Sequence, residues 1–402
     1  MAVIKITNDV YSVGVLNPHL RVFDIIMETK FGTSYNAYLI KGGEKLALVE
    51  TVHEKFFDEY IENIKQVCDL SKIEYLIMNH NEPDHSGSVA KLLNILPNIT
   101  LVASQAGGVC LKAITNRPDL KLKVVKDGDT LDLGGKELNF INAPFLHWPD
   151  SMFTYSEQDK ALFTCDFLGC HYCEPTMFDY GVKYNDDFEE SLHYYYDCIM
   201  GPFKPHVLKG LEKIKGLDIQ FACTSHGPVL TAGHKLPLTI KRYELWSTPK
   251  EKGNVKIPIF YCSAYGYTGR LADAIQEGIL EEIPQAEAPV YDIIEHDMDM
   301  LAGKLNESDG FFIGSCTINR DAVPPIWQLL SHIDAINSQK KSCAVFGSYG
   351  WSGEAVPAIM QRLKDLRLCV LENGLKVNFV PSGADLNKAK ELGREFAKQF
   401  KN

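Results

Sequence analysis

One short segment restricts the possible folds and functions of this chain more than any other feature of its sequence. The six residues His80-Asn81-Glu82-Pro83-Asp84-His85 place four potential metal ligands directly after the strand-like run IEYLIMN. Titratable groups this close together would repel one another or stay uncompensated unless a cation lay among them. Loops that follow buried strands are also where functional sites are commonly built. The segment therefore predicts a metal-binding loop at the end of a sheet.

Three further candidate ligands, His147, Asp166 and His226, each follow another strand-like run. These runs are INAPFL, ALFTC and FACTS, and we expect each polar residue to stand where its strand ends. A lone buried histidine is more often a hydrogen-bonded structural residue than a ligand, so neither histidine would define a site by itself. They are candidates for the partners that the 80–85 loop needs from elsewhere in the chain.

The chain has 402 residues, more than one hydrophobic core usually serves, so at least two domains are expected. Its formal net charge of −11 argues against nucleic acid or an anionic membrane as a partner, because those surfaces select basic faces. No signal-peptide pattern opens the sequence, and no apolar run is long enough to cross a bilayer. We therefore expect a cytoplasmic protein that acts on small molecules.

Eleven cysteines, an odd number scattered along the chain, suit a reducing compartment better than a disulfide framework. Cys165, Cys170 and Cys173 have the spacing of a plant-type iron–sulfur site, with Cys198 further on. The simpler alternative is that Cys165 ends a buried strand as a small apolar residue and that the others are free thiols. We adopt this alternative and exclude the cysteines from the predicted sites.

The first half mixes paired strands with strands that alternate with helices. Residues 36–50 predict two strands joined by a Gly-Gly turn, and 54–68 has the apolar spacing of a helix. Further helices are expected at 86–95, 187–200 and 233–246. This mixture predicts a layered sheet covered by helices, of the α+β class.

A linker and a more regular second half follow. Residues 247–254 are polar, contain Pro and Gly and lack an apolar period, which gives predicted domains at 1–250 and 251–402. Strand-like and helical runs then alternate, with helices expected from Gly269 and at 323–333, 353–366 and 384–400. This alternation is typical of a doubly wound α/β sheet.

Three stretches of the second half have the residues of a phosphate-binding site. The first joins a strand to a helix, whose N-terminus offers positive potential to an anion. A glycine-containing turn before a helix is weak evidence alone, but two more loops follow neighbouring strands of the expected sheet. The three are Ser263-Ala264-Tyr265-Gly266-Tyr267-Thr268-Gly269, Gly314-Ser315-Cys316-Thr317-Ile318-Asn319 and Gly347-Ser348-Tyr349-Gly350-Trp351-Ser352-Gly353. They predict one ligand site, at which Tyr349 and Trp351 could cover an aromatic ring.

The pattern H-x-E-x-D-H, followed at long intervals by His, Asp and His, resembles the metallo-β-lactamase-like domain of flavodiiron proteins, also called A-type flavoproteins. The resemblance covers nearly the whole chain, because the three later stretches are similar to the FMN-binding loops of the family's flavodoxin domain. It implies an αββα sandwich followed by a flavodoxin-like doubly wound parallel sheet, with FMN and two irons as cofactors. Glu82 stands where zinc hydrolases of this fold have a histidine, and a carboxylate there favours iron.

The resemblance also implies the role of each site residue. One iron would be held by His80, Glu82 and His147, the other by Asp84, His85 and His226, and Asp166 would bridge them. The FMN contacts would be Ser263, Ala264, Tyr265, Gly266, Tyr267, Thr268, Ser315, Cys316, Thr317, Ile318, Asn319, Ser348, Tyr349, Gly350, Trp351 and Gly353. Cys316 departs from the proline of many relatives.

The sequence leaves open the roles of several further residues that could lie near the metal loop. Either Tyr195 or Tyr196 matches a catalytic tyrosine position near the diiron pocket, because consecutive tyrosines leave the register ambiguous. Glu50 stands where many members have Asp. His19 and Trp148 are further pocket candidates, and core packing or a surface position explains them equally well.

The resemblance implies an oxidoreductase that passes electrons from FMN to a non-haem diiron centre and reduces dioxygen to water, nitric oxide to nitrous oxide, or both. The sequence ends without a rubredoxin-like C-x2-C tail, so we expect a separate donor, either rubredoxin or a reduced deazaflavin. The family implies a head-to-tail homodimer or a dimer of such dimers. Two other classes stay open: a zinc hydrolase fused to a redox module, and an electron-carrying flavoprotein whose first half is a scaffold.

Overall fold

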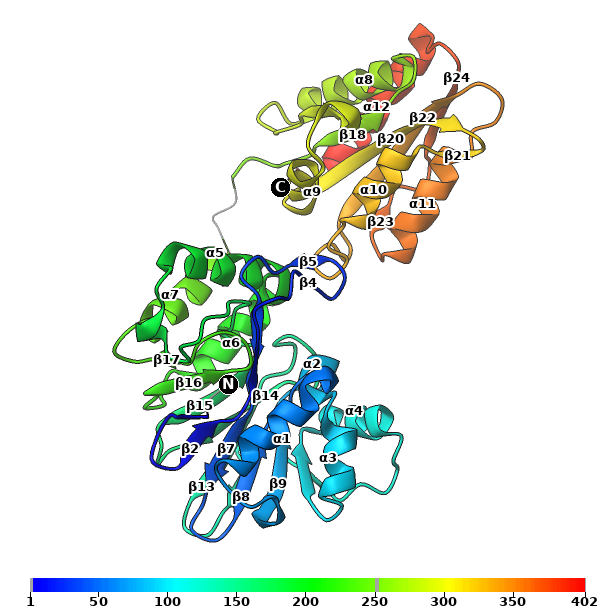
Figure 1. Cartoon of the computed structure of the whole chain (residues 1–402). Coiled ribbons are helices and arrows are strands. Elements are labelled where there is room, and N and C mark those ends of the chain that lie inside the picture. Colours follow the sequence, from blue (N-terminus) through cyan, green and yellow to red (C-terminus); the bar gives the residue numbers. More distant parts are fainter. Residues whose placement is uncertain (1–2, 250–252, 402) are drawn as a thin grey trace. The chain divides into compact units, whose positions relative to one another are not determined.

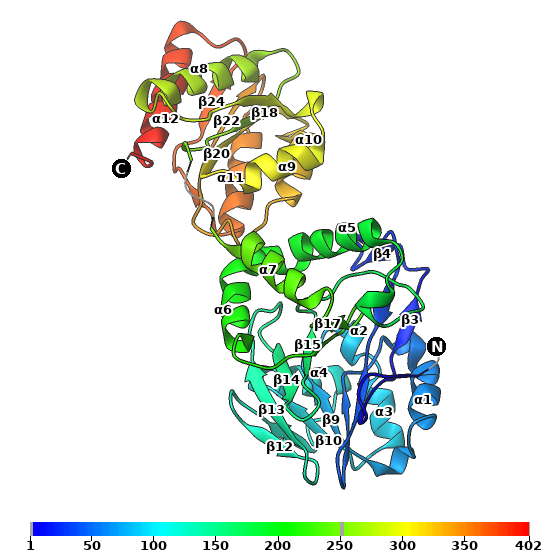
Figure 2. The same cartoon turned by 90° about the vertical axis from the view of Figure 1, so that its left-hand side faces the viewer.

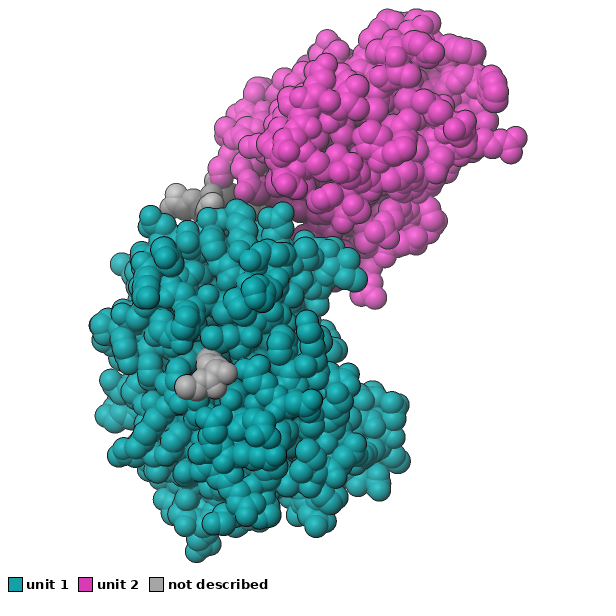
Figure 3. All heavy atoms as spheres, viewed as in Figure 1, with its two compact units in different colours: residues 1–249 teal, residues 250–402 magenta. Residues whose placement is uncertain are grey.

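The computed structural model describes residues 3–249 and 253–401, so the predicted domain boundary at 250/251 lies outside the described residues. The chain divides into two compact units, 1–249 and 250–402, shown in teal and magenta in Figure 3. Each unit has its own sheets and hydrophobic cores. Among the described helices, none is long and apolar enough to cross a membrane.

Two larger sheets lie at the centre of the first unit (Figure 1). In order of pairing, the first contains β1 (Ile4–Lys5), β2 (Val10–Ser12), β7 (Tyr38–Lys41), β8 (Leu46–Val49), β9 (Ile73–Met78), β10 (Thr100–Ala103) and β11 (Leu122–Val124). The second contains β12 (Thr130–Asp132), β13 (Glu137–Asn142), β14 (Met152–Ser156), β15 (Ala161–Cys165), β16 (Phe221–Thr224) and β17 (Leu230–Thr231). Two small sheets pair β3 (Val15–Asn17) with β6 (Thr33–Tyr35) and β4 (Val22–Phe23) with β5 (Met27–Glu28).

Helices cover the outer faces of the two large sheets. They are α1 (Phe57–Lys65), α2 (Pro83–Ser86), α3 (Val89–Ile95), α4 (Gln105–Thr115), α5 (Asn185–Tyr195), α6 (Lys204–Ile214) and α7 (Leu236–Ser247). Short 3-10 turns lie at Glu54–Phe56, Leu70–Lys72, Asp179–Gly181 and Gly201–Phe203, and a π-helical turn at Tyr196–Met200.

Alternating strand residues build three stacked cores in this unit. Leu48 shares a core with Tyr60 of α1, whereas its neighbour Val49 shares another with Phe140 of the second sheet. On the far side of the second sheet, Phe153 shares the third core with Phe188 of α5. Helix, sheet, sheet and helix therefore follow one another, which confirms the αββα sandwich.

The predicted helix at 86–95 corresponds to α3 at 89–95, while its first residue, Ser86, ends the separate helix α2. A Cβ at Gly87 would lie 2.4 Å from the Pro83 carbonyl oxygen, so only glycine fits where α2 ends. The helix expected at 187–200 is α5, continued by the π-helical turn. Helices α4 and α6 were not predicted.

The second unit contains one mainly parallel sheet, seen from another side in Figure 2. In order of pairing it contains β19 (Val290–Asp292), β18 (Ile259–Cys262), β20 (Gly310–Ile318), β22 (Ser342–Tyr349) and β23 (Cys369–Val370), and β24 (Leu375–Asn378) also pairs with β22. Its helices are α8 (Tyr267–Glu282), α9 (Met298–Asn306), α10 (Pro324–Ser331), α11 (Ala355–Asp365) and α12 (Gly383–Lys398), with a 3-10 turn at Ile293–Glu295.

Helices cover both faces of this sheet, again because strand residues alternate. Phe311 shares a core with Leu329 of α10, and the next residue, Phe312, shares the opposite core with Ile275 of α8. The predicted doubly wound, flavodoxin-like sheet is therefore confirmed.

Two of the predicted loops in this unit are partly strand. β20 continues to Ile318 because its last residues pair with the short antiparallel strand β21 (Asp321–Ala322). β22 continues to Tyr349 because it pairs there with β24. The interpretation of 314–319 and 347–353 as loops beginning at their glycines was therefore wrong, although both stretches still end their strands side by side.

Candidate metal and flavin sites

The 80–85 segment leaves the carboxyl end of β9, between β8 and β10 in the first sheet. Glu82 is extended, with φ −58° and ψ 145°, and Pro83 then begins α2, a position that suits proline. His80, Glu82, Asp84 and His85 are all buried. The turn from extended chain to helix thus keeps four polar side chains inside the unit.

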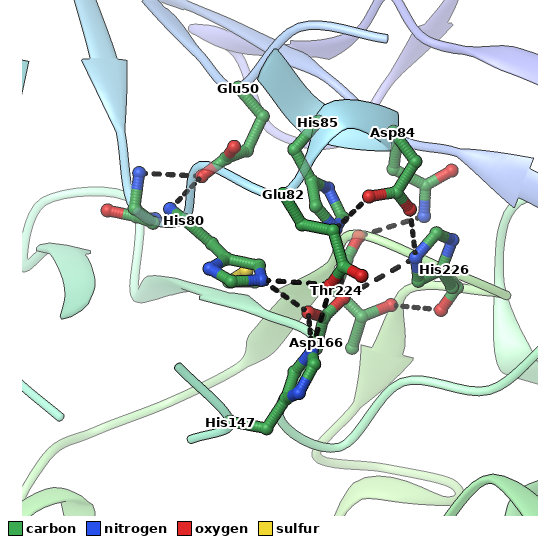
Figure 4. A network of polar contacts seen from close by, with 12 residues as sticks. Glu50, His80, Glu82, Asp84, His85, His147, Asp166, Thr224 and His226 are labelled. Atoms are coloured by element: carbon green, nitrogen blue, oxygen red, sulfur yellow. Dashed lines mark hydrogen bonds and ion pairs between the residues drawn. The ribbon is translucent and has the colours of Figure 1, made fainter. Parts of the chain in front are cut away.

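His147, Asp166 and His226 reach the same place from the second sheet (Figure 4). Asp166 follows β15 directly, and His226 lies two residues after β16, the parallel neighbour of β15. His147 lies in the loop between β13 and β14, so the prediction that it ends a strand was wrong. Both sheets therefore contribute to one cluster.

The first group of the cluster contains His80, Glu82, His147 and Asp166. The Nε2 atoms of His80 and His147 lie 3.2 and 3.0 Å from Glu82 Oε2. Both nitrogens also lie 3.5 Å from Asp166 Oδ2. Two imidazoles and two carboxylates therefore converge on one point.

The second group contains Asp84, His85 and His226. Asp84 Oδ1 lies 3.3 Å from His85 Nε2, and its Oδ2 lies 3.0 Å from His226 Nε2. The same two nitrogens lie 3.1 and 3.4 Å from Asp166 Oδ1. Each group therefore receives one oxygen of the Asp166 carboxylate.

Several ligand atoms of the cluster lack the hydrogen bonds that buried polar groups normally make. Among the described residues, both carboxylate oxygens of Asp84 and Asp166 and both ring nitrogens of His85 have no hydrogen-bond partner. Burial opposes a charged His85, yet Asp84 and Asp166 raise its pKa to about 10. Burial and the neighbouring Glu82 raise the pKa of Asp24 to about 6. Orphaned ligand atoms and concentrated negative charge fit metal cations in this site.

Cys165 also lies within reach of the cluster, since its Sγ groups with ligand atoms of His85 and Asp166. Burial raises the pKa of its thiol far above the usual range, and the protonated thiol is a poor ligand. Cys170 and Cys173 join Cys165 in no ligand group of the described residues. The iron–sulfur alternative thus gains no support.

Two buried carboxylates that are not candidate ligands contact the start of the 80–85 segment. Glu50 Oε1 accepts the backbone N–H groups of Asn79 and His80, at 2.7 and 3.2 Å, which gives this residue a role that its sequence position left open. Asp150 Oδ1 lies 3.3 Å from His80 Nδ1, and its Oδ2 accepts from Asn81 Nδ2 at 2.8 Å. A carboxylate there orients the imidazole and fixes its tautomer. Sequence reasoning missed Asp150, because one acidic residue in a loop carries no signal.

His226 is held by a different set of groups. Its Nδ1 lies 2.7 Å from the Ser34 carbonyl oxygen, which leaves Nε2 for the cluster. Thr33 Oγ1 lies 3.3 Å from the same Nδ1 and 2.8 Å from His171 Nδ1. His171 is buried, with its ring centroid 4.6 Å from that of His226. Sequence reasoning missed His171 as well, since a single histidine between cysteines has no diagnostic spacing.

The structure separates the two tyrosine candidates. Tyr195 is buried, with its ring centroid 5.0 Å from His171 and 6.1 Å from His226. The Tyr196 hydroxyl instead lies 2.7 Å from Ser247 Oγ, at the end of α7. Of the two alternatives, Tyr195 therefore lies toward the cluster and Tyr196 toward α7, because successive residues of a helix point in different directions.

The two remaining pocket candidates also differ. Trp148 packs edge-on against His80, with the ring centroids 5.1 Å apart. His19 is exposed. Of the two, only Trp148 touches a residue of the metal cluster.

In the second unit, the first predicted stretch ends at the N-terminus of α8. Gly266 precedes this helix with φ +79°, a conformation that residues with side chains rarely adopt. The Thr268 N–H donates to Ser263 Oγ at 3.2 Å. The N-cap residue, Gly266, has no side chain that could accept from the other N–H groups of the first turn. The helix end can therefore bind an anion such as a phosphate.

The other two stretches lie beside this helix end, because β20 pairs with β18 and β22 pairs with β20. Thr268 Oγ1 lies 2.8 Å from Ser348 Oγ, which ties the start of α8 to β22. Of the predicted pair of covering rings, Trp351 is 97% exposed and Tyr349 is half-buried, and Tyr265 is a further exposed ring at 83%. Cys316 is buried, and burial raises the pKa of its thiol. A phosphate-bearing aromatic cofactor fits these features.

The other predicted contacts lie within the same stretches. They are Ala264 and Tyr267 around the start of α8, Ser315, Thr317, Ile318 and Asn319 along the last part of β20 and just after it, and Tyr349, Gly350 and Gly353 at the end of β22 and beyond.

Comparisons with known proteins match the two units separately and the chain as a whole. A family model described as ODP family beta lactamase matches residues 33–227, and one described as Flavodoxin matches 259–393. The chain is 53% identical over 401 residues to the flavo-diiron protein FprA2 of Clostridium acetobutylicum, covering 100% of both proteins. It is 34% identical to the anaerobic nitric oxide reductase flavorubredoxin of Aeromonas hydrophila, covering 99% of this chain and 80% of that protein.

Two solved structures resemble the chain along nearly its full length. The flavodiiron protein from Giardia intestinalis aligns with a TM-score of 0.68 and 28% identity, covering 99% of this chain and 97% of that one. The rubredoxin oxygen:oxidoreductase from Desulfovibrio gigas aligns with a TM-score of 0.70 and 27% identity, covering 99% and 98%.

Proposed function

This chain belongs to the flavodiiron proteins, and we propose that it acts as one, with two irons in the first unit and FMN in the second. When bound, these cofactors supply the electron transfer that reduces dioxygen to water, nitric oxide to nitrous oxide, or both. Of the relatives described above, one is named an anaerobic nitric oxide reductase and another a rubredoxin oxygen:oxidoreductase.

The position of the Asp166 carboxylate is the main observation that supports the proposed metal ligands. Its Oδ2 faces the group of His80, Glu82 and His147, and its Oδ1 faces the group of Asp84, His85 and His226. We therefore assign one iron to each group, with Asp166 between them. Imidazole with several carboxylates suits non-haem iron, and seven protein side chains leave coordination positions open on two metals.

The protein's own contribution is to hold these ligands fixed and buried. Glu50 fixes the backbone at the start of the loop, Asp150 orients His80, and the Ser34 carbonyl orients His226. Ligands held in this way need little rearrangement when charge changes at the site.

In the second unit, we assign the FMN phosphate to the N-terminus of α8. Ser263 and Thr268 lie within that turn, and the helix dipole favours an anion there. Tyr349 and Trp351 would cover the flavin ring, together with the exposed Tyr265. The bound cofactor would then lie at the ends of β18, β20 and β22.

Metal and flavin analysis of one purified sample tests the proposal. We expect two irons and one FMN per chain, and Cys165→Ala should keep both irons because the thiol is not a ligand. Zinc in place of iron would support the hydrolase alternative. Flavin without any bound metal would support the electron-carrier alternative.

We place the protein in the cytoplasm and propose a rubredoxin-type protein as its electron donor. The names of the flavorubredoxin and rubredoxin oxygen:oxidoreductase relatives favour this donor. Gas consumption should be slow with NADH alone and fast once a rubredoxin and its reductase are added. Fast turnover with a reduced deazaflavin and no rubredoxin would replace this donor with the other candidate.

We further propose a head-to-tail homodimer, alone or paired into a dimer of dimers, in which the flavin of one subunit serves the irons of its partner. The support is that the assigned metal ligands and flavin contacts lie in different units of the chain. Asp166→Ala and Thr268→Glu subunits, each inactive alone, should regain roughly a quarter of wild-type activity after subunit exchange, because half of the dimers are mixed and each has one working pair. Mixed dimers without activity would place electron transfer within one chain.

A further inference from the structure

Residues 224–227 form the ligand turn, which carries the assigned metal ligand His226 past the end of strand β16 (Figure 4). The strand ends at Thr224, two residues before this ligand. Gly227 has φ +76°, and a Cβ there would lie 2.8 Å from the Cys170 carbonyl oxygen, so the turn requires glycine. Because His226 lies outside the strand, contacts other than a strand ladder must fix its position.

Asn36, which lies between β6 and β7, contacts this turn from outside the second sheet. Its Nδ2 donates to the carbonyl oxygens of Thr224 and Gly227, both at 2.8 Å. Its backbone N–H donates to the Ser225 carbonyl oxygen at 2.9 Å. The fourth carbonyl oxygen of the turn, that of His226, accepts from Thr224 Oγ1 at 2.8 Å. Asn36 therefore holds the backbone on both sides of the ligand.

Two residues close to Asn36 in the chain add to this hold. Ser34 Oγ accepts the Gly227 N–H at 2.9 Å, and the Ser34 carbonyl oxygen lies 2.7 Å from His226 Nδ1. The Tyr38 hydroxyl donates to the same strand-end carbonyl oxygen as Asn36, at 2.5 Å. The side chains involved are buried, so solvent does not compete for these hydrogen bonds. The backbone of the turn and the ring of its histidine are thus held from one short segment of chain.

Burial makes an asparagine at position 36 costly. Asn36 is buried, and its Oδ1 has no hydrogen-bond partner among the described residues. A buried amide oxygen without a partner costs free energy, which an apolar side chain of the same shape would avoid. Only the amide nitrogen can donate to two carbonyl oxygens at once, so the turn determines the orientation of the amide. The contacts with the turn therefore account for this residue.

We propose that Asn36 is a positioning residue for the second ligand group, because its amide holds the ligand turn where His226 can bind metal. The His226 Nε2 atom lies 3.0 Å from Asp84 Oδ2 and 3.4 Å from Asp166 Oδ1, so the turn sets its distance from both carboxylates. This role rests on the proposed function, since it assumes a metal ion in that group. The first ligand group has no residue in the turn, so only one of the two metals should respond.

Cobalt binding tests this role without any turnover. Metal-free wild-type protein titrated with Co2+ should bind two ions per chain. Asn36→Ala should weaken one of the two sites by roughly 10- to 100-fold and leave the other at the wild-type affinity, as expected when a group that supports a ligand is lost. The visible absorption of bound Co2+ and competition with a chelator report both affinities.

Asn36→Leu separates positioning from stability, because leucine keeps the branched shape and removes the unpaired oxygen together with the donors. Its metal-free form should unfold at a temperature no lower than that of Asn36→Ala, yet the same cobalt site should be weakened. This variant also decides the question if Asn36→Ala does not fold.

Asn63 provides a matched control. It is buried in α1, and its Nδ2 donates to the Gly14 and Val13 carbonyl oxygens at 2.8 and 3.3 Å. Asn63→Ala removes the same donors and should bind both Co2+ ions as the wild type does. Wild-type cobalt affinities in the folded Asn36 variants, or equal losses in Asn63→Ala, would refute the positioning role alone. A wild-type protein that binds neither Co2+ nor iron would refute the proposed metal centre instead.

Discussion

The candidate sites of the two units differ in the groups that form them. In the first unit, six buried side chains and the partly exposed His147 converge, and buried groups such as Glu50 and Asp150 hold them in place. In the second, the proposed flavin site consists of a helix end, the ends of three strands, and exposed aromatic side chains. Side chains define the first site, whereas backbone geometry defines the second.

This difference predicts different sensitivities to mutation. A ligand cluster loses its chemistry when one side chain is removed, because each atom has a separate role. A backbone cradle tolerates most side-chain losses but not a new charge or an added bulk. The following predictions test this contrast.

The largest effect is expected for Asp166→Ala. Gas reduction should fall by more than about a hundredfold, since even residues behind the ligands commonly cost 10- to 100-fold. FMN content should stay at the wild-type level, because Asp166 lies in the first unit. Oxygen- or nitric-oxide-electrode rates with iron and flavin analysis provide the measurement. Wild-type turnover would exclude a diiron centre at this cluster.

Thr268→Glu should remove FMN while leaving the irons bound. Thr268 is fully buried beside Ser348, so a carboxylate there would repel the flavin phosphate and disturb the start of α8. Thr268→Ser, which keeps the hydroxyl, is the matched control and should bind FMN normally. The flavin absorbance of the purified variants reports the result. Stoichiometric yellow flavin in the glutamate variant would mean that the phosphate binds elsewhere.

Asp150→Asn should weaken iron binding by roughly 10- to 100-fold and leave FMN unchanged. The carboxylate of Asp150 lies against His80 Nδ1, and an amide cannot hold the imidazole in the same way. Asp127→Asn, which alters an exposed carboxylate paired with Lys213, is the control and should bind iron normally. Chelator competition measures the affinities. Equal affinities for both variants would show that Asp150 does not support the ligand.

The smallest effect is expected for Trp351→Ala. An exposed ring that packs on a flavin contributes about 0.5–1.5 kcal/mol, or roughly two- to tenfold in FMN affinity. Tyr184→Ala removes another exposed aromatic ring, in the first unit, and should leave FMN affinity unchanged. Fluorescence titration of the flavin-free proteins distinguishes them. A loss as complete as that of Thr268→Glu would contradict the view that backbone groups dominate this site.

Much of the fold was predictable because its longer strands are runs of several apolar residues in a row. The runs at β9, β15 and β20 were found for this reason, whereas β1 to β6 are two or three residues long and too short to stand out. Helix α4 was missed because it contains Gly107 and Gly108, which disfavour helices. A Cβ at these positions would lie 3.0 Å from Asn81 and 2.7 Å from Leu122, so packing against the rest of the unit explains the glycines.

The sequence by itself determined which residue types could bind metal and phosphate, because four ligands within one loop and three stretches after strands depend only on local order. Only the tertiary structure shows that the two oxygens of Asp166 face different ligand groups. It also shows that Tyr195 lies beside His226, whereas Tyr196 lies beside Ser247. It also revealed Asp150 and His171. Chain spacing specifies neighbours within one strand or loop, but side chains from two sheets meet only when the sheets pack together.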